Sequence, residues 1–173
     1  MNKTNTPTLG MSLGSAGLKL IQKFETFQAA LYDHDGGGHC TVGWGHLVHK
    51  GKCDGRENEK FFLKGITQTK ADSLLMSDTS LAEGAVNRQV AALGVTLSQN
   101  QFDALVTFTY NVGTGNLAKM LKACTGTNGQ IDLKKIPDKM KVYDKSSGKI
   151  ALGLTMRRQV EIELFNKQEA ANG

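Results

Sequence analysis

Residues 23–46 read KFETFQAALYDHDGGGHCTVGWGH, and the hydrophobic pattern of the chain changes within them. Before them, apolar residues recur every three or four positions, which predicts a helix capped by Ser15 and ending between Glu25 and Gln28. Over residues 31–52, short apolar pieces alternate with Gly and Asp, a pattern typical of turns and a small antiparallel sheet. The chain is therefore predicted to pass directly from a helix into a sheet.

The rest of the chain predicts mainly helices. The strongest signals are an apolar stripe over residues 67–93 and a capping box in which Ser98 precedes Gln101 by three positions. Further helices are expected over residues 116–124, 133–142 and 155–168. The last of these is expected to bury Met156, Val160, Leu164 and Phe165. A loop over residues 51–65 is expected to hold a short packed piece at Phe61, Phe62 and Leu63.

These elements predict an α+β fold. Helices form one lobe, and a small β lobe is confined to residues 30–50. A cleft between two lobes is a common place for a binding site.

The composition is that of an ordinary globular protein, with 39% hydrophobic and 21% charged residues among 173. We expect a flexible tail over residues 1–14 and one domain over residues 15–173. No stretch is apolar for long enough to span a bilayer and no signal-peptide pattern is present, so we expect synthesis in the cytoplasm. The net charge of +5 suits an acidic partner. No basic stripe is interleaved with aromatic residues, which argues against nucleic-acid binding.

Glu25 is the first residue whose position suggests chemistry. The carboxyl end of a helix and the apolar Phe24 beside it both disfavour an ionised carboxylate, and a glutamate that keeps its proton can act as a general acid. The alternative is a solvated glutamate at a frayed helix end. Asp33 or Asp35 could face Glu25 as the second carboxylate of a glycosidase, or both could accept hydrogen bonds in a turn.

Thr41 lies in a predicted strand close to Gly43 and Gly45. Because side chains alternate between the two faces of a strand, these three residues should share one face. A hydroxyl flanked by two glycines would leave that face open to a polymer chain or an ordered water. The alternative is that the glycines mark a β-bulge and Thr41 is an ordinary strand residue.

The histidines raise the alternative of a metal site. The residues concerned are His34, His39, His46, His49, Cys40 and Cys53. Zinc favours four such ligands, but no pair here has the tight spacing of a zinc motif. We therefore expect no metal, with His46 hydrogen-bonded within the β lobe and the other histidines exposed. Cys40 and Cys53 would pair in an oxidising compartment, but free thiols, including that of Cys124, are expected in the cytoplasm.

Together these residues resemble the active-site signature of the phage-type lysozymes, glycoside hydrolase family 24. That signature is a helix ending in Glu, then Tyr and Asp, a Gly-containing turn, and Thr-(Ile/Val)-Gly-x-Gly-His. The corresponding residues are Glu25, Tyr32, Asp35, Thr41, Val42, Gly43, Gly45 and His46. QFDALVTFTYNVGTG at 101–115 is similar to the central helix of the family, and GLTMRRQVEIELF at 153–165 is similar to its Gly-Leu-x-x-Arg-Arg-x-x-Glu ending. The resemblance, to endolysin-like muramidases, covers most of residues 15–168.

The resemblance implies a muramidase that hydrolyses the β-1,4 bond between N-acetylmuramic acid and N-acetylglucosamine in peptidoglycan. Glu25 would protonate the leaving oxygen, Asp35 would act on the water side of the sugar as base or stabiliser, and Thr41 would hold the water, with inversion. Nine residues separate Glu25 from Asp35, where the family usually has eight. The five residues between Asp35 and Thr41 match the family, so we prefer Asp35 to Asp33.

Accessory roles follow from the same resemblance. Arg157 would orient Glu25 through a charge-assisted hydrogen bond, or would only pair with Glu161 on a helix surface. Other residues that could line or orient the site are His46, Asn111 and Gln101.

No cofactor is implied, and the expected partner is the glycan strand of peptidoglycan. We expect a monomer without stable membrane insertion that reaches the cell wall through a phage holin or a bacterial secretion machine. Two other functions stay open. One is a wall-binding module without turnover, and the other is a zinc-binding module that uses the His and Cys residues at 34–53.

Overall fold

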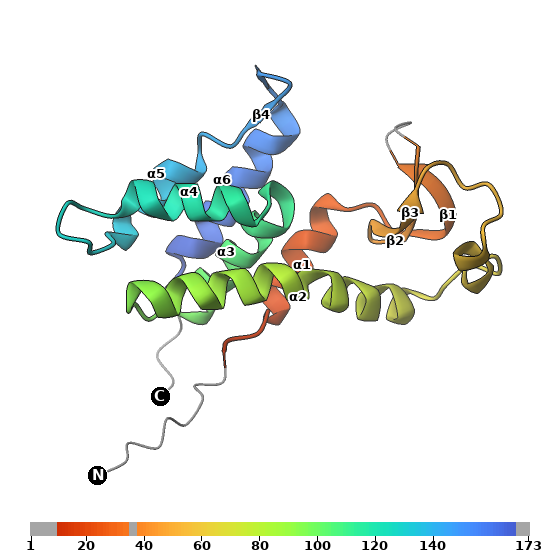
Figure 1. Cartoon of the computed structure of the whole chain (residues 1–173), viewed down its shortest axis with the longest axis horizontal. Helices are drawn as coiled ribbons and strands as arrows, with labels where there is room; N and C mark the ends of the chain where they lie inside the picture. Colours follow the sequence, from red (N-terminus) through yellow and green to blue (C-terminus); the bar gives the residue numbers. More distant parts are fainter. Residues whose placement is uncertain (1–9, 35–37, 169–173) are drawn as a thin grey trace, which may run out of the picture.

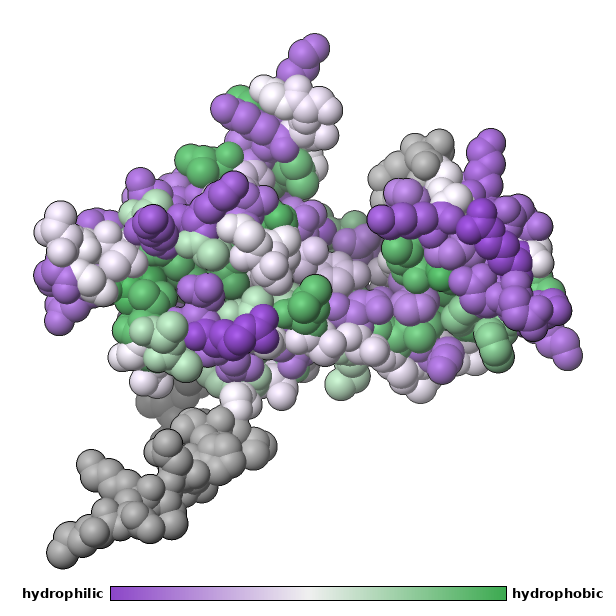
Figure 2. Space-filling view, viewed as in Figure 1, coloured by the Kyte–Doolittle hydropathy of each residue, from purple (hydrophilic) through white to green (hydrophobic). Residues whose placement is uncertain are grey.

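The computed structural model describes residues 10–34 and 38–168, which form a helical lobe and a small β lobe (Figure 1). The long helix α2 (Gln68–Leu93) runs along both lobes, since it contacts the sheet as well as the other helices. Figure 2 shows that the surface is hollowed between the two lobes. The α+β fold predicted from the sequence is confirmed.

The β lobe is an antiparallel sheet of three strands in the order β1 (Gln28–His34), β2 (His39–Gly43) and β3 (His46–Lys50). Thr41 is paired with Tyr32 of β1 on one side and with Leu47 of β3 on the other. The sheet is therefore where the sequence predicted it.

A 3-10 helix, η1 (Glu57–Phe61), follows the sheet. The packed piece predicted here is wrong for two of its three residues, because Phe61 and Leu63 are 82% and 67% exposed. The buried residue of this segment is Glu59, which a hydropathy pattern cannot single out. Its carboxylate accepts hydrogen bonds from the N–H groups of residues 54–56, and those bonds offset the cost of burying it.

The helical lobe is built around α3 (Gln99–Val112), in which every residue from 102 to 109 is buried. The helices that contact it are α1 (Ser15–Phe24), α2, α4 (Thr114–Cys124) and α6 (Leu152–Asn166). The short helix α5 (Ile136–Met140) packs on α4 and α6, after the 3-10 turn η2 (Leu133–Lys135). Aliphatic and aromatic side chains from these helices form one continuous core.

The helix ends show which local signals were sufficient. Ser98 and Gln101 form the predicted capping box, and α2 ends at Gly94, whose positive φ of 63° suits a residue without Cβ. The predicted Ser15 cap is wrong, because the Asp103 carboxylate of α3 instead accepts the N–H groups of Gly14 and Gly17 at 2.8 and 3.0 Å. A cap supplied by a residue so distant in the chain leaves no local sequence signal.

The last helix buries a different face from the one predicted. Met156 is 55% exposed, and Val160 and Leu164 are only half-buried. Its buried residues are Arg157, Arg158, Glu161 and Phe165. Before it, residues expected to form a solvated loop make a second, two-stranded sheet, β4 (Lys145–Ser146) with β5 (Lys149–Ile150), so the sheet structure is not confined to residues 30–50.

Residues 1–9 of the predicted tail lie outside the described residues. The following segment is held in place, since Met11 exchanges two hydrogen bonds with the Asn87 side chain of α2 at 2.9 and 2.8 Å. In the described part of the chain, no helix combines the length and the apolar character that crossing a membrane requires.

Candidate functional site

Glu25 lies where the two lobes meet, as the residue directly after α1 and shortly before β1. Its backbone N–H still donates to the Ile21 carbonyl, whereas its own φ and ψ are extended, so the helix ends at this residue as predicted. The side chain is 21% exposed. The turn between β2 and β3 comes close to the carboxylate, and a Cβ placed on Gly45 would lie 3.4 Å from Glu25 Oε2. A glycine at this turn therefore leaves room beside the acid.

Arg157 holds Glu25 from the helical lobe. Its Nη1 donates to Glu25 Oε1 at 3.2 Å, its Nε donates to Glu161 Oε1 at 3.2 Å, and its guanidinium lies 5.4 Å from the centre of the Phe24 ring. Both interactions considered from the sequence are therefore present. The pair with Glu161 is buried rather than on a helix surface, since Glu161 is fully buried and the Arg157 side chain is 6% exposed.

A second arginine shares the same carboxylate. Arg158 contacts both Glu161 oxygens, at 3.1 and 2.9 Å, and its Nη2 donates to Asn111 Oδ1 of α3 at 2.8 Å. Burial raises the pKa of Glu161 to about 7 against the opposing effect of the two arginines. The structure thus places Asn111 next to Arg158, one residue away from the arginine that contacts Glu25.

Tyr110 of α3 is a site residue that the sequence analysis did not single out. Burial raises the pKa of its hydroxyl well above the ordinary range, and the negative charges of Glu25 and Asp78 raise it further. Tyr110 therefore keeps its proton at the cleft. Only its place in the 101–115 block could have marked it.

Thr41 is buried in β2, 2% exposed, and its hydroxyl donates to the His39 carbonyl at 2.8 Å. The open face predicted for this strand is wrong at Gly43, because a Cβ there would lie 3.0 Å from the Ala71 side chain of α2. The strand is covered by a helix, so alternation along the sequence could not reveal which face is free. The Thr41 hydroxyl oxygen still has lone pairs with which to accept a hydrogen bond.

Asp35, the preferred second carboxylate, lies outside the described residues. Asp33 lies in β1 rather than in a turn, and its exposed carboxylate accepts the Cys53 N–H at 2.9 Å. This bond gives Asp33 a structural role, because it attaches the loop after β3 to the first strand.

His46 forms an ion pair with Asp78 of α2, in which Nδ1 lies 2.9 Å from the carboxylate. We expected its hydrogen bond within the β lobe, so this partner is a correction. A second carboxylate of α2, that of Asp72, accepts from Trp44 Nε1 at 2.7 Å and from Gln22 Nε2 of α1 at 2.8 Å. Both aspartates attach the β2–β3 turn to the helices.

The cysteine prediction is wrong, because Cys40 and Cys53 form a disulfide while Cys124 is a buried free thiol. His49 was expected to be exposed, but its side chain is only 9% exposed and its Nε2 lies 2.7 Å from Glu59. His39 is exposed as expected, and the His34 side chain lies outside the described part. Among the described residues, Cys40, His49 and Glu59 are the group whose ligand atoms lie close enough together to hold a metal.

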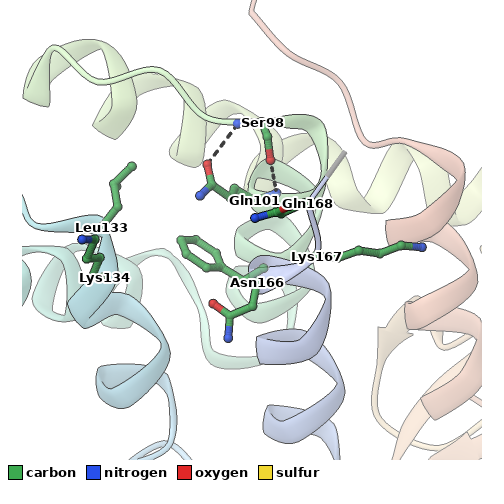
Figure 3. Close-up of a pocket in the computed structure, with 8 residues that line it drawn as sticks. Ser98, Gln101, Leu133, Lys134, Asn166, Lys167 and Gln168 are labelled. Atoms are coloured by element: carbon green, nitrogen blue, oxygen red, sulfur yellow. Dashed lines mark hydrogen bonds between the residues drawn. The ribbon is translucent and has the colours of Figure 1, made fainter. Parts of the chain in front are cut away.

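Gln101 does not line the cleft. With Ser98 it borders a separate pocket of about 380 Å3 between the start of α3 and the end of α6 (Figure 3). Its side chain accepts the Ser98 N–H at 3.0 Å, so the capping interpretation is the one confirmed.

Comparison with known proteins agrees with this arrangement. A family model described as phage lysozyme matches residues 22–161. The endolysin of Bacillus phage PZA is 33% identical over 165 residues, which cover 94% of this chain and 58% of that protein. The chain thus spans just under three-fifths of the length of this relative.

Two solved structures are similar over nearly their whole length. An endolysin from Escherichia coli O157:H7 phage FAHEc1 has a TM-score of 0.69 at 27% identity and covers 90% of this chain and 94% of its own. The muramidase domain of SpmX from Asticaccaulis excentricus has a TM-score of 0.69 at 25% identity, with 91% and 99% covered. The residues that the family model matches include Glu25, the three strands of the β lobe and Arg157. The chain belongs to the phage lysozyme family.

Proposed function

We propose that this protein is a lysozyme that hydrolyses the β-1,4 bond between N-acetylmuramic acid and N-acetylglucosamine in peptidoglycan. The observation that carries the proposal is the position of Glu25 at the junction of the two lobes, partly exposed and held by Arg157. Endolysins and a muramidase domain among its relatives support the same activity.

Glu25 is the general acid of the proposed reaction. The carboxyl end of α1 disfavours its charged form, whereas Arg157 favours it and fixes the direction of the carboxyl group. When the sugar is bound and water is excluded, Glu25 gives its proton to the leaving glycosidic oxygen. The buried partners of Arg157 prevent the guanidinium from moving away during this step.

Asp35 and Thr41 act on the opposite side of the sugar. The Asp35 carboxylate stabilises the oxocarbenium-like charge or accepts a proton from the attacking water, and the Thr41 oxygen accepts a hydrogen bond from that water. The reaction inverts the configuration, so NMR of the first products should show the α anomer. A first product that keeps the β configuration would replace this scheme with a covalent intermediate.

A turbidity assay on purified peptidoglycan tests the function. Glu25→Gln should lower the clearing rate by at least about 100-fold, because an amide cannot supply the proton that a general acid gives. Glu57→Gln is the matched control, since its side chain is 83% exposed on η1, and it should clear like the wild type. Equal clearing by Glu25→Gln and wild type would contradict the proposal. Wild-type binding without any clearing would favour a non-catalytic wall-binding module.

The substrate in this proposal is the glycan strand of the cell wall, and the protein acts as a monomer. The net charge of +5 favours contact with an acidic envelope polymer. Delivery to the wall by a holin or a secretion machine completes the proposal.

A further inference from the structure

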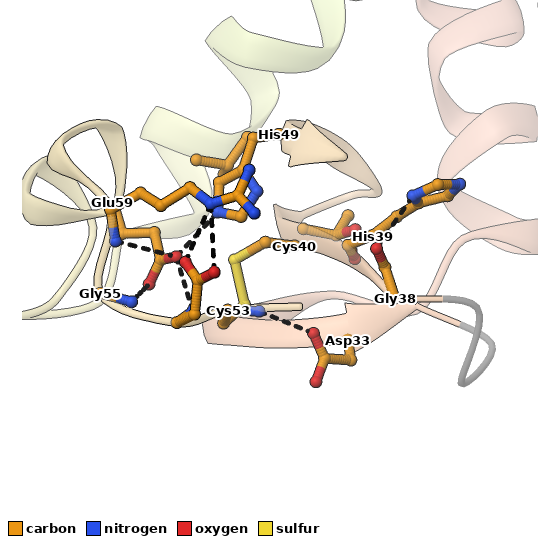
Figure 4. The surroundings of a disulfide bond; sticks show 12 residues. Asp33, Gly38, His39, Cys40, His49, Cys53, Gly55 and Glu59 are labelled. Carbon is orange, nitrogen blue, oxygen red and sulfur yellow. Dashed lines mark hydrogen bonds and ion pairs between the residues drawn. A yellow bond between two sulfur atoms is a disulfide. The ribbon is translucent and has the colours of Figure 1, made fainter. Parts of the chain in front are cut away.

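A buried group of chemically reactive side chains lies in the β lobe, at the disulfide (Figure 4). The Cys40 sulfur, a nitrogen of His49 and a carboxylate oxygen of Glu59 all lie within 4.8 Å of one another. Cys40 is fully buried, and the side chains of His49 and Glu59 are only 9% and 4% exposed. Cys53 is bonded to Cys40 and brings a second sulfur to the same place.

The two non-sulfur groups are already oriented as metal ligands usually are. His49 directs Nδ1 to the Lys50 carbonyl at 3.0 Å, which leaves Nε2 facing Glu59 at 2.7 Å. The Glu59 carboxylate is fixed by the N–H groups of residues 54–56. In metal sites, a ligating histidine typically donates its other N–H to a carbonyl, and ligating carboxylates are themselves hydrogen-bonded.

We propose that the reduced protein binds one zinc ion through Cys40, Cys53, His49 and Glu59. Zinc accepts sulfur, nitrogen and oxygen ligands and prefers four of them in a tetrahedral site. In the oxidised protein the two sulfur atoms are bonded to each other and cannot act as thiolates. The disulfide and the metal are therefore alternative cross-links between β2 and the loop that leads to η1.

The chemistry balances with a dithiol or a phosphine as the reductant. Two electrons and two protons convert the disulfide into two thiols, while the dithiol becomes a disulfide or the phosphine becomes its oxide. Zinc then displaces the two thiol protons. The Lys50 carbonyl and Glu59 raise the pKa of His49, so zinc must also displace a proton from Nε2 when the imidazole is charged. Affinity should consequently fall as the pH is lowered.

The surrounding charges suit this set of ligands. Two thiolates and one carboxylate around a divalent ion leave a net charge of −1. The Arg56 guanidinium donates to the Lys50 carbonyl at 3.0 Å and opposes the protonation of His49. A cation beside the site offsets the negative complex and favours the neutral imidazole that binds metal.

Cobalt is a suitable probe, because its spectrum reports thiolate ligation directly and zinc has none. The full-length protein would be reduced with a phosphine, freed of the reductant without oxygen, and titrated with Co2+. We expect a sulfur-to-cobalt absorption band that saturates at one equivalent, disappears on addition of Zn2+, and never forms with the oxidised protein. Zn2+ should also raise the Tm of the reduced protein but not of the oxidised protein.

Variants separate this site from other thiols. Cys40→Ser/Cys53→Ser should lose the band, and Glu59→Gln should weaken cobalt binding at least about tenfold. Cys124→Ala, which changes the buried thiol of α4, is the matched control and should keep the band. The proposal is overturned if reduced wild type gives no thiolate band, or if the double serine variant keeps it. A reduced protein that unfolds and does not refold with Zn2+ would also overturn it.

Discussion

At the residue scale, the two aspartates after β1 begin can now be assigned different tasks. The sequence left both as candidates, because each is an acid at a plausible distance from Glu25 along the chain. Asp33 is exposed and accepts the Cys53 N–H, so its carboxylate is used in attaching a loop. The proposed catalytic role therefore goes to Asp35 alone.

Alanine substitutions at these two positions test this division. Asp33→Ala removes one exposed hydrogen bond and should lower the peptidoglycan clearing rate less than tenfold. Asp35→Ala removes the group that acts on water and should lower it by about 100-fold or more. Initial clearing rates at equal concentrations of folded protein provide the measurement. A reversed order of the two losses would move the catalytic role to Asp33.

Glu161 is the residue that connects the site to the interior. Above its pKa of about 7 the carboxylate is ionised and is shared by Arg157 and Arg158. We expect Glu161→Gln to destabilise the protein by about 3 kcal/mol at pH 8, because both guanidiniums would remain buried without their shared anion. Urea unfolding measures the difference. Glu163→Gln, on the exposed side of the same helix, should change stability by less than about 0.5 kcal/mol, and equal effects of the two variants would contradict the argument.

At the element scale, the sequence predicted the structure best where the signal was local. The capping box of α3, the glycine at the end of α2 and the sheet over residues 30–50 each depend on residues a few positions apart. It failed on α6, where apolar spacing marked Met156 as buried while the buried face carries charged residues paired at intervals of three and four. Hydropathy cannot recognise burial that depends on such pairing, and the pairing requires Glu25 and Asn111 from elsewhere in the chain.

The link between β3 and η1 predicts a pH dependence of stability in the oxidised, metal-free protein. His49 and three N–H groups lower the pKa of Glu59 from 4.5 to about 2, so its contribution is lost as the pH falls below 4.5. The pKa of His49 is raised above 6.5, so its contribution is lost as the pH rises through that higher value.

Thermal melting of wild type and Glu59→Gln should therefore differ most between pH 5 and 6. The difference in Tm should shrink on both sides of this window. Glu57→Gln, in the same 3-10 helix but exposed, should show no such window. A Tm difference that is constant from pH 3 to pH 9 would show that the ion pair does not carry the effect.

At the scale of the whole molecule, the proposed machinery is divided between the two lobes. Glu25 is fixed by Arg157 of the helical lobe, whereas Thr41 and Asp35 belong to the β lobe and its connecting turn. Helix α2 joins the lobes, since its first half carries Asp72 and Asp78 toward the sheet and its second half packs into the helical core. The sequence predicted this helix but not its bridging role, because each bond joins residues at least 28 positions apart.

Asp72 is the most direct test of that bridge, because one of its oxygens accepts from both Trp44 of the β lobe and Gln22 of α1. Asp72→Ala should cost about 2–3 kcal/mol, the range for a hydrogen bond to a charged group. It should lower kcat, since the two halves of the site would no longer be held in register. Hydrogen exchange should show lost protection in β1–β3 while α3 stays protected. Asp72→Asn keeps an acceptor oxygen and should lose less of both, and a loss of protection spread evenly over both lobes would instead mean that Asp72 supports the fold as a whole.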